Sequence, residues 1–322
     1  MIMIDKEIER RAALVSKVID RYLPIIRPKG LYEASRHLVD SGGKRLRPSM
    51  LLLAAEATGG DPEKLVSAAL SIELIHNFTL IHDDIMDDAE LRRGKKAVHI
   101  IWGTSGAILA GDTLYSRAFE ILGMTPVGSD LLLAAMKILS KTSTSICEGQ
   151  WMDIEFEARD DVSEEEYMEM IEKKTGVLYG ASASMGALLS GASENMVKGL
   201  DRFGRLTGMG FQIQDDVLDL TTDPSIFGKK RAGDLLEGKK TLVIIHAQSN
   251  GVKLNIFGKK DATQMEIEEA LKLLQTAGSI DYARSCAEEL VVQGKKALDI
   301  LPESPTKTLM LELADYMIRR RY

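Results

Sequence analysis

The sequence predicts an all-α protein, and three observations support this prediction. Apolar residues recur at helical spacing almost throughout the chain, strand-like alternation never persists, and helix start and stop signals bracket long segments. Several of these segments are long and uninterrupted, which is typical of a helical bundle. The first apolar run shows the spacing with Ile8, Ala12, Val15, Ile19 and Tyr22.

Start signals for the helices occur in order along the chain. Asp61 suits an N-cap with Pro62 at the first helical position, and capping-box patterns begin at Ser163 and Thr263. No Pro-rich linker or low-complexity tract divides the chain, so we expect residues 1–322 to form one domain. The stop signals are Gly59-Gly60, the turn from Thr125 to Gly128, Gly191 and Asn250-Gly251.

Composition argues against several classes of protein. The formal charge of -7 at pH 7 disfavours a nucleic-acid partner, because a phosphate backbone requires a basic surface. We find no apolar run long enough for a signal peptide or a transmembrane segment, so we expect a cytoplasmic protein. Cys147 and Cys286 lack the spacing of a zinc site or disulfide framework, and their apolar contexts predict buried free thiols.

An acidic cluster follows an apolar helical run that is expected to start near Pro62. It contains Asp83, Asp84 and Asp87. Because Asp83 and Asp87 are four residues apart, both carboxylates lie on one helix face, about one turn apart, and can chelate cations together. His76, close to two turns before Asp83, would project into the same groove.

A second cluster repeats the pattern with Asp215, Asp216 and Asp219, and Gln212 lies about one turn before its first member. Two facing helices of this kind could build one site. Aspartate oxygens without His or Cys partners at ligand spacing suit magnesium, which keeps water ligands and commonly binds phosphate oxygens. A solvated helix face is the alternative for either run alone, but both follow apolar residues directly and share one spacing.

Basic segments flank both clusters, as an acidic metal site that handles diphosphates requires. The segment from Gly42 to Pro48 carries Lys44, Arg45 and Arg47 before a helix, where backbone donors also favour an anion. Each basic run alone is more often a solvated surface. The other runs are Arg92-Arg93-Gly94, Lys174-Thr175, Phe227-Gly228-Lys229-Lys230 and Glu237-Gly238-Lys239-Lys240.

With these motifs in this order, the chain resembles the trans-type isoprenyl diphosphate synthases, most closely the short-chain geranylgeranyl or farnesyl type. The likeness spans nearly the whole length. Lys96 and Val243 stand where the family often has Pro, which affects loop geometry more than chemistry. The resemblance implies the isoprenoid synthase fold and a homodimer of helical bundles. Each bundle would have a deep central cavity, with both acidic motifs at its mouth.

The resemblance also implies a reaction. Isopentenyl diphosphate would condense with an allylic diphosphate (dimethylallyl, geranyl or farnesyl) to give geranylgeranyl diphosphate, with farnesyl or longer products as the alternative. Two or three magnesium ions would bridge the allylic diphosphate to the motifs. The implied metal ligands are Asp83, Asp87, Asp215 and Asp219, and the implied catalytic set adds Asp84, Asp216 and Lys174.

Basic and polar residues are divided between the two substrates by the same resemblance. Those implied to grip the allylic diphosphate are Arg92, Lys174, Thr175, Gln212, Lys229 and Lys239. Those implied to bind isopentenyl diphosphate are Lys44, Arg47, His76 and Arg93, with Arg45 nearby.

Product length is expected to depend on how deep the pocket runs before a bulky residue closes it. Phe78 and Thr79 precede Asp83 by five and four residues, about 6–8 Å along a helix. The helical wheel points Thr79 at the groove more directly, whereas the resemblance names Phe78 and favours a twenty-carbon product. A core phenylalanine is the alternative.

Two other functions compete with this interpretation. A terpene cyclase ionises the same kind of substrate, but it guides cations over aromatic walls, and aromatic residues make up only 5% of this chain. The repeated Asp-Asp-x-x-Asp motif and the Lys44 to Arg47 segment also favour two diphosphate substrates.

A non-catalytic regulatory subunit is the second alternative. A lost aspartate in either motif would indicate it, and none is missing.

Overall fold

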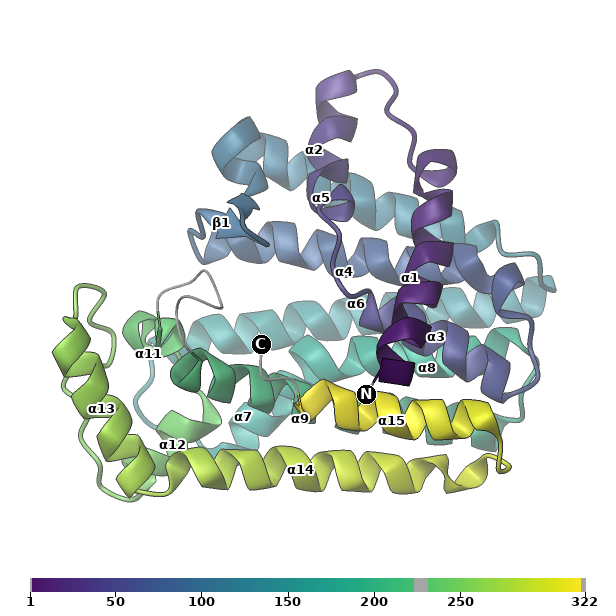
Figure 1. Cartoon of the computed structure of the whole chain (residues 1–322). Helices are drawn as coiled ribbons and strands as arrows, with labels where there is room; N and C mark the ends of the chain where they lie inside the picture. Colours follow the sequence, from purple (N-terminus) through teal and green to yellow (C-terminus); the bar gives the residue numbers. More distant parts are fainter. Residues whose placement is uncertain (1, 223–230, 320–322) are drawn as a thin grey trace. The chain divides into compact units, whose positions relative to one another are not determined.

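The computed structural model describes residues 2–222 and 231–319 (Figure 1). The chain forms two compact units. Unit 1 comprises Met1–Ser143, Ala181–Asp201 and Ile300–Met310, and unit 2 comprises Thr144–Gly180, Arg202–Asp299 and Leu311–Tyr322. The assignment of residues 1–322 to a single domain stays a prediction.

The helices and strands are divided between the two units as follows. Unit 1 contains α1 (Ile2–Tyr22), α2 (Lys29–Asp40), α3 (Leu46–Ala57), the 3-10 helix η1 (Pro62–Leu65), α4 (Val66–Met86), β1 (Leu91–Arg92), β2 (Lys95–Lys96) and α5 (Val98–Gly123). Unit 2 contains α7 (Glu164–Ile171), the π-helix η2 (Glu172–Gly176), α11 (Gly233–Glu237), α12 (Leu242–Ser249), α13 (Gln264–Thr276) and α14 (Ser279–Ala297). Residues of both units are contributed by α6 (Ser129–Glu157), α8 (Val177–Leu189), α9 (Glu194–Thr221), η3 (Leu298–Ile300) and α15 (Pro305–Arg319).

The all-α prediction is confirmed, with one small addition. Within the described residues the strands are limited to an antiparallel hairpin in which Leu91 pairs with Lys96 and Arg92 with Lys95. Its two central residues, Arg93 and Gly94, both have positive φ, 53° and 73°, as a type I′ turn requires. Strands of two residues are too short to show alternation, so the sequence pattern could not reveal them.

Helix α4 forms the centre of unit 1. It lies along α5 (Figure 1) and also contacts α1, α2 and α3. The stretch Pro62–Met86 is long and apolar enough to cross a membrane by length and composition, although we expected no such stretch, and 72% of its most apolar window is buried in the protein. A helix that is apolar on all sides and enclosed by neighbours is a core helix. Ile72, Leu74 and Ile75 are fully buried accordingly.

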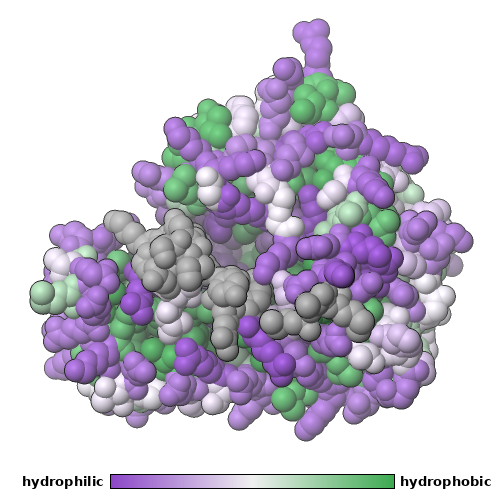
Figure 2. Space-filling view, viewed as in Figure 1, coloured by the Kyte–Doolittle hydropathy of each residue, from purple (hydrophilic) through white to green (hydrophobic). Residues whose placement is uncertain are grey.

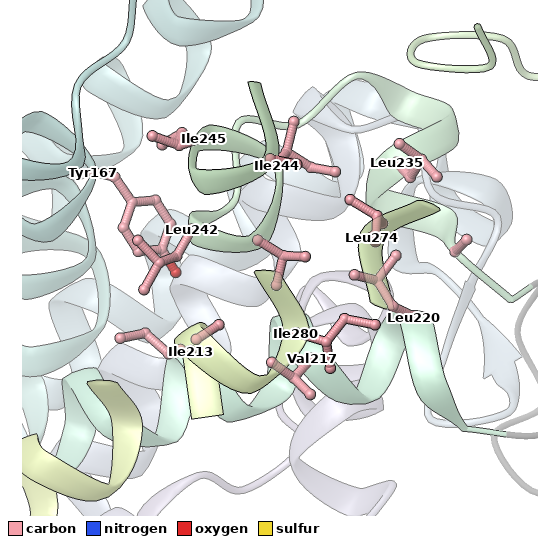
Figure 3. Packing of buried hydrophobic residues seen from close by; sticks show 14 of the residues in the cluster. Tyr167, Ile213, Val217, Leu220, Leu235, Leu242, Ile244, Ile245, Leu274 and Ile280 are labelled. Atoms are coloured by element: carbon pink, nitrogen blue, oxygen red, sulfur yellow. The ribbon is translucent and has the colours of Figure 1, made fainter. Parts of the chain in front are cut away.

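The core of unit 2 gathers around the second half of α9 (Figure 3). Ile213, Val217 and Leu220 recur at helical spacing on α9 and are buried against α7, α11, α12, α13 and α14. This packing sets the side of α9 that faces the core. The labelled partners in Figure 3 are Tyr167, Leu235, Leu242, Ile244, Ile245, Leu274 and Ile280.

The predicted helix starts are confirmed by their hydrogen bonds. Asp61 accepts from the backbone N–H of Glu63 at the start of η1. Both capping boxes form in full: Ser163 with Glu166 begins α7, and Thr263 with Glu266 begins α13. The Ser163 box fixes where α7 begins and thus where this helix enters the core of unit 2.

Hydrophilic residues predominate on the face shown in Figure 2. Neither Cys147 nor Cys286 forms a disulfide among the described residues, as predicted, but Cys147 is exposed and Cys286 is only partly buried, so the prediction of burial was wrong. The preceding Ile146 is buried. One residue further along a helix turns the side chain by about 100°, which carries Cys147 away from the core.

Candidate functional site

The first acidic motif occupies the last turn of α4. The backbone N–H of Asp87 donates to the carbonyl of Asp83 at 2.8 Å, so the two residues are one helical turn apart, as predicted. Both are partly buried, whereas Asp84 between them is fully buried. Unit 1 therefore presents Asp83 and Asp87 as a possible chelating pair on one helix face.

Asp84 is held by the hairpin that follows the motif. Its Oδ1 accepts from Nε of Arg92 on β1 at 2.8 Å. Burial raises the pKa of Asp84, and the hydrogen bond and charge of Arg92 oppose that rise. Arg92, expected to grip the allylic diphosphate, thus lies beside the first motif with its position fixed by a carboxylate.

The cations expected around isopentenyl diphosphate also lie together in unit 1. Nη1 of Arg47 lies 3.2 Å from Nε2 of His76, and Arg93 donates to the backbone carbonyls of Leu38 and Gly42. Burial lowers the pKa of His76 well below its ordinary value, and the charges of Arg47, Arg93 and Arg92 lower it further. His76 is therefore neutral at pH 7, and its place is beside Arg47.

Arg45 takes a different place from its neighbours in the segment. It adopts a left-handed φ of 46°, is buried, and donates through Nη2 to the carbonyl of Val39 at 3.0 Å. Its Nη1 lies 3.5 Å from buried Glu73. Arg45 therefore supports the loop from inside the protein, whereas Lys44 is exposed.

The second acidic motif lies on α9. Asp215 and Asp219 are partly buried, but Asp216 is buried and both of its oxygens have donors. Oδ2 accepts from the Tyr167 hydroxyl at 2.6 Å, and Oδ1 accepts from Nε2 of Gln212 at 2.9 Å. Burial raises the pKa of Asp216 well above its ordinary value, and the nearby charge of Asp234 adds to that rise.

The segment after the second motif is tied back to it. Oδ2 of Asp219 accepts from the backbone N–H of Asp234 at 3.1 Å, at the start of α11. Lys239 lies 3.1 Å from Glu237 and 3.8 Å from Asp234. Gly228 and Lys229, which belong to the same predicted basic segment, lie outside the described residues.

Lys174 and Thr175 sit in the π-helix η2, a local widening of a helix that frequently occurs at functional sites. Nζ of Lys174 donates to Asp153 at 2.6 Å, and the Thr175 hydroxyl donates to Oε1 of Gln212 at 2.9 Å. Gly149 on α6 packs against this backbone so closely that an added Cβ would lie 2.4 Å from the Lys174 nitrogen. The absence of a side chain at Gly149 is thus what permits this contact.

The two chain-length candidates lie on α4, about one turn before the first motif. The ring of Phe78 meets Tyr115 of α5 edge-on at a centroid distance of 5.3 Å, and His82 at 4.9 Å. The Thr79 hydroxyl donates to the carbonyl of His76 at 2.8 Å. Phe78 therefore belongs to an aromatic contact between α4 and α5.

Sequence reasoning did not single out four residues that contact the predicted site residues. They are Glu73 beside Arg45, Asp153 beside Lys174, Tyr167 beside Asp216 and Tyr115 beside Phe78. Glu73 carries a signal, because it is the one acidic residue within the apolar run from Val66 to Ile75. The others lie at ordinary helical positions, and only the fold brings them beside a motif.

The side chains of the two acidic motifs that could bind a metal ion are all carboxylates. Among the described residues, no three His, Cys, Asp or Glu side chains are grouped as a ready chelate. Magnesium suits this donor set, because it is usually bound by one or two carboxylates together with water and substrate phosphates. The residues present therefore fit that ion when a diphosphate accompanies it.

A helical fold with two such aspartate motifs, each accompanied by arginine or lysine, defines a class of enzymes that bind diphosphate esters with the help of divalent cations. The polyprenyl synthetase family model matches residues 28–274, and the chain belongs to that family.

Individual relatives extend over the whole chain. The chain is 54% identical to a geranylgeranyl diphosphate synthase of Methanosarcina mazei, with 100% of this chain and 99% of that protein covered. It is 45% identical to a geranylfarnesyl diphosphate synthase of Natronomonas pharaonis, with 99% and 98% covered. Among solved structures, a geranylgeranyl pyrophosphate synthetase of Geoglobus acetivorans matches with a TM-score of 0.93 at 48% identity, with 97% and 99% covered. The resemblance seen in the motifs is thereby confirmed, as is the prediction of a trans-prenyltransferase.

Proposed function

We propose that this chain condenses isopentenyl diphosphate with allylic diphosphates to make geranylgeranyl diphosphate, releasing diphosphate. The observation that carries the proposal is full-length similarity to geranylgeranyl diphosphate synthases in a chain that keeps both acidic motifs intact. One similar relative is named for a longer product, so product length requires its own test.

The acidic motifs are assigned to the allylic substrate. Asp83, Asp87, Asp215 and Asp219 would hold two or three magnesium ions. Bound there, magnesium neutralises charge on the departing diphosphate. Further ligands for that diphosphate are Arg92, Lys174, Thr175, Gln212, Lys239 and, outside the described residues, Lys229.

Two of these cations are already positioned by carboxylates, Arg92 by Asp84 and Lys174 by Asp153. Breaking the allylic carbon–oxygen bond leaves a delocalised cation and a multiply charged anion, so stabilising the leaving group is the main task. Cations held in place before the reaction need no reorganisation as that charge develops. Arg92 and Lys174 therefore suit the ionisation step.

The cluster of Arg47, His76 and Arg93, with Lys44 on the loop that precedes α3, is assigned to isopentenyl diphosphate. Several positive charges concentrated around a neutral histidine favour a multiply charged anion. The isopentenyl double bond then attacks the allylic carbon, and the new cation loses a proton. We assign that proton to an oxygen of the departing diphosphate, which lies beside the reacting carbons.

We further propose a cytoplasmic homodimer without a nucleic-acid partner. Unit 1 exposes Ile101, Ile108 and Leu109 of α5, each at least 43% exposed. Ile101 precedes the kink of α5 at Gly103, and Ile108 and Leu109 follow it. A second copy would cover these exposed apolar side chains. Sedimentation velocity tests the dimer, and a monomer at every concentration would contradict it.

A primer series tests the proposed reaction directly. Labelled isopentenyl diphosphate is incubated with magnesium and dimethylallyl, geranyl or farnesyl diphosphate, and the products are separated by chromatography. We expect a labelled twenty-carbon diphosphate from each primer. Unlabelled cyclic hydrocarbons formed from the primer alone would instead identify a terpene cyclase, and no consumption of either substrate would indicate a non-catalytic protein.

A further inference from the structure

Tyr167 lies beside the second acidic motif without belonging to it. It is 1% exposed, on α7, and its hydroxyl donates to Oδ2 of Asp216 at 2.6 Å. The capping box at Ser163 fixes the start of α7, and Figure 3 shows the Tyr167 ring beside Leu242 in the core of unit 2. The ring is therefore held by packing and the hydroxyl is directed at a single carboxylate.

The Tyr167 bond is the first in a chain of three. Gln212 donates to the other oxygen of Asp216 at 2.9 Å, and Thr175 donates to Gln212 at 2.9 Å. The chain joins α7, the π-helix η2 and α9 within unit 2. Because Thr175 and Gln212 are assigned to the allylic diphosphate, it connects a buried tyrosine to groups that would contact substrate.

The geometry of α9 makes this chain relevant to Asp215. Adjacent residues on a helix are about 100° apart, so Asp216 is directed into the core and Asp215 is directed away from it. Both carboxylate oxygens of Asp216 accept hydrogen bonds, one from Tyr167 on α7 and one from Gln212 on α9, and this fixes the direction of the side chain. Loss of one of these donors would let the Asp216 side chain change its direction, and the adjacent Asp215 and the Gln212 amide would adjust to it, while Ile213 and Val217 keep α9 packed on the core.

Because Asp216 is buried, replacement of Tyr167 would leave the Asp216 carboxylate with one donor fewer, and bulk solvent could not readily take the place of that donor. A buried carboxylate that loses a donor must find another partner or be exposed to water. Gln212 is the nearest partner that can respond, and turning its amide would break its bond with Thr175. The same movement would disturb the grip on the diphosphate.

We propose that Tyr167 is a positioning residue that sets the direction of Asp215 and of the Gln212 amide for binding magnesium and diphosphate, acting through Asp216. The inference rests on the proposed function for its substrate. Tyr167 itself contacts neither metal nor diphosphate.

The test is Tyr167→Phe, which keeps the ring and removes only the donor. Calorimetric titration with inorganic diphosphate in the presence of magnesium should show binding weakened about tenfold, the lower range for residues that orient metal ligands. Circular dichroism should be unchanged. The magnesium concentration needed for half-maximal prenyl transfer should rise in parallel.

Tyr282→Phe is the matched control. The Tyr282 hydroxyl also donates to a carboxylate of unit 2, Glu164, at 2.8 Å, but neither residue touches the motif. We expect this variant to bind magnesium and diphosphate like the wild type. Equal weakening by both variants would show a general loss of stability and would overturn the inference.

A double-mutant cycle with Thr175→Val tests the chain itself. If Tyr167 and Thr175 act through the same bonds, their effects on diphosphate binding will be less than additive, whereas independent effects will add. Additive effects, or unaltered binding in Tyr167→Phe, would overturn the inference. If Tyr167→Phe does not fold, Asp216→Leu takes its place, because it removes the acceptor shared by Tyr167 and Gln212. Wild-type diphosphate affinity in that variant would overturn the inference.

These measurements separate the inference from the proposed function. Binding of inorganic diphosphate with magnesium does not depend on which prenyl product is formed. A wild-type protein that binds diphosphate but transfers no prenyl group would contradict the proposed function, and the Tyr167 comparison would still stand.

Discussion

Asp84 and Asp216 hold the same position in the two acidic motifs, although Asp216 has a donor on each oxygen and Asp84 only on Oδ1 among the described residues. Both are buried, and both accept hydrogen bonds from side chains of the protein. Asp83, Asp87 and Asp215 are only partly buried. A helix cannot direct neighbouring carboxylates at one ion, so the second aspartate of each motif is better suited to holding the helix than to binding metal.

His76 provides a residue-scale prediction about pH. Its pKa in the folded protein is depressed, so below about 6.5 the unfolded chain binds a proton that the folded protein does not, and stability falls. His76→Gln removes this contribution. Thermal unfolding at pH 7.5 and 5.5 should therefore show a smaller acid-induced loss in the variant. An equal loss in both proteins would contradict the neutral assignment of His76.

Phe78 provides a second prediction at this scale, on product length. Phe78→Ala removes the ring that meets Tyr115 between α4 and α5, and it would deepen the product pocket that the resemblance implies. We expect most of the product to shift from twenty carbons to twenty-five or more, measured by chromatography after dephosphorylation. Thr79→Ala is the comparison variant. Longer products from Thr79→Ala alone would assign the limit to Thr79, as the helical wheel suggests.

At the scale of elements, the π-helix η2 and the β1–β2 hairpin place cations where regular elements would not. The hairpin carries Arg92 to Asp84, and its turn holds Arg93 at a positive φ. The π-helix carries Lys174 to Asp153 and Thr175 to Gln212. The hairpin thus connects Arg92 with the first acidic motif, and the π-helix connects Thr175, through Gln212, with the second.

Gly149→Ala tests the π-helix. The new Cβ would lie 2.4 Å from the Lys174 nitrogen and 2.8 Å from the Lys173 carbonyl carbon, which are backbone atoms that cannot move aside cheaply. We expect a loss of about 1–3 kcal/mol in the free energy of unfolding, together with a higher KM for the allylic substrate. Gly128→Ala is the control, because its Cβ would meet no atom within 4 Å. Equal behaviour of the two variants would contradict this role for the contact.

The sequence was sufficient for the elements with strong local signals. Apolar periodicity predicted the helices, and the caps at Ser163 and Thr263 are confirmed in full. It could not reveal the hairpin, whose strands are too short to alternate, or the exposure of Cys147, which depends on which side of α6 is covered. Nor could it reveal that Arg45 pairs with Glu73 or that Tyr167 bonds Asp216, because those contacts join residues far apart in the chain.

At the scale of the whole molecule, each unit contains one acidic motif with its own basic residues. Unit 1 carries Asp83 and Asp87 with Arg92, and unit 2 carries Asp215 and Asp219 with Lys174. That the two motifs hold one magnesium cluster stays a prediction. If they share one cluster, ionisation of the allylic diphosphate requires both motifs, since neither alone would neutralise the leaving diphosphate.

The most direct test compares the wild type with Asp83→Ala and Asp215→Ala in one assay with labelled isopentenyl diphosphate, farnesyl diphosphate and magnesium. We expect a labelled twenty-carbon diphosphate from the wild type. Each variant should form it on the order of 100-fold more slowly while keeping its helical circular dichroism spectrum. A wild type that incorporates no label, or either variant turning over at the wild-type rate, would contradict the account.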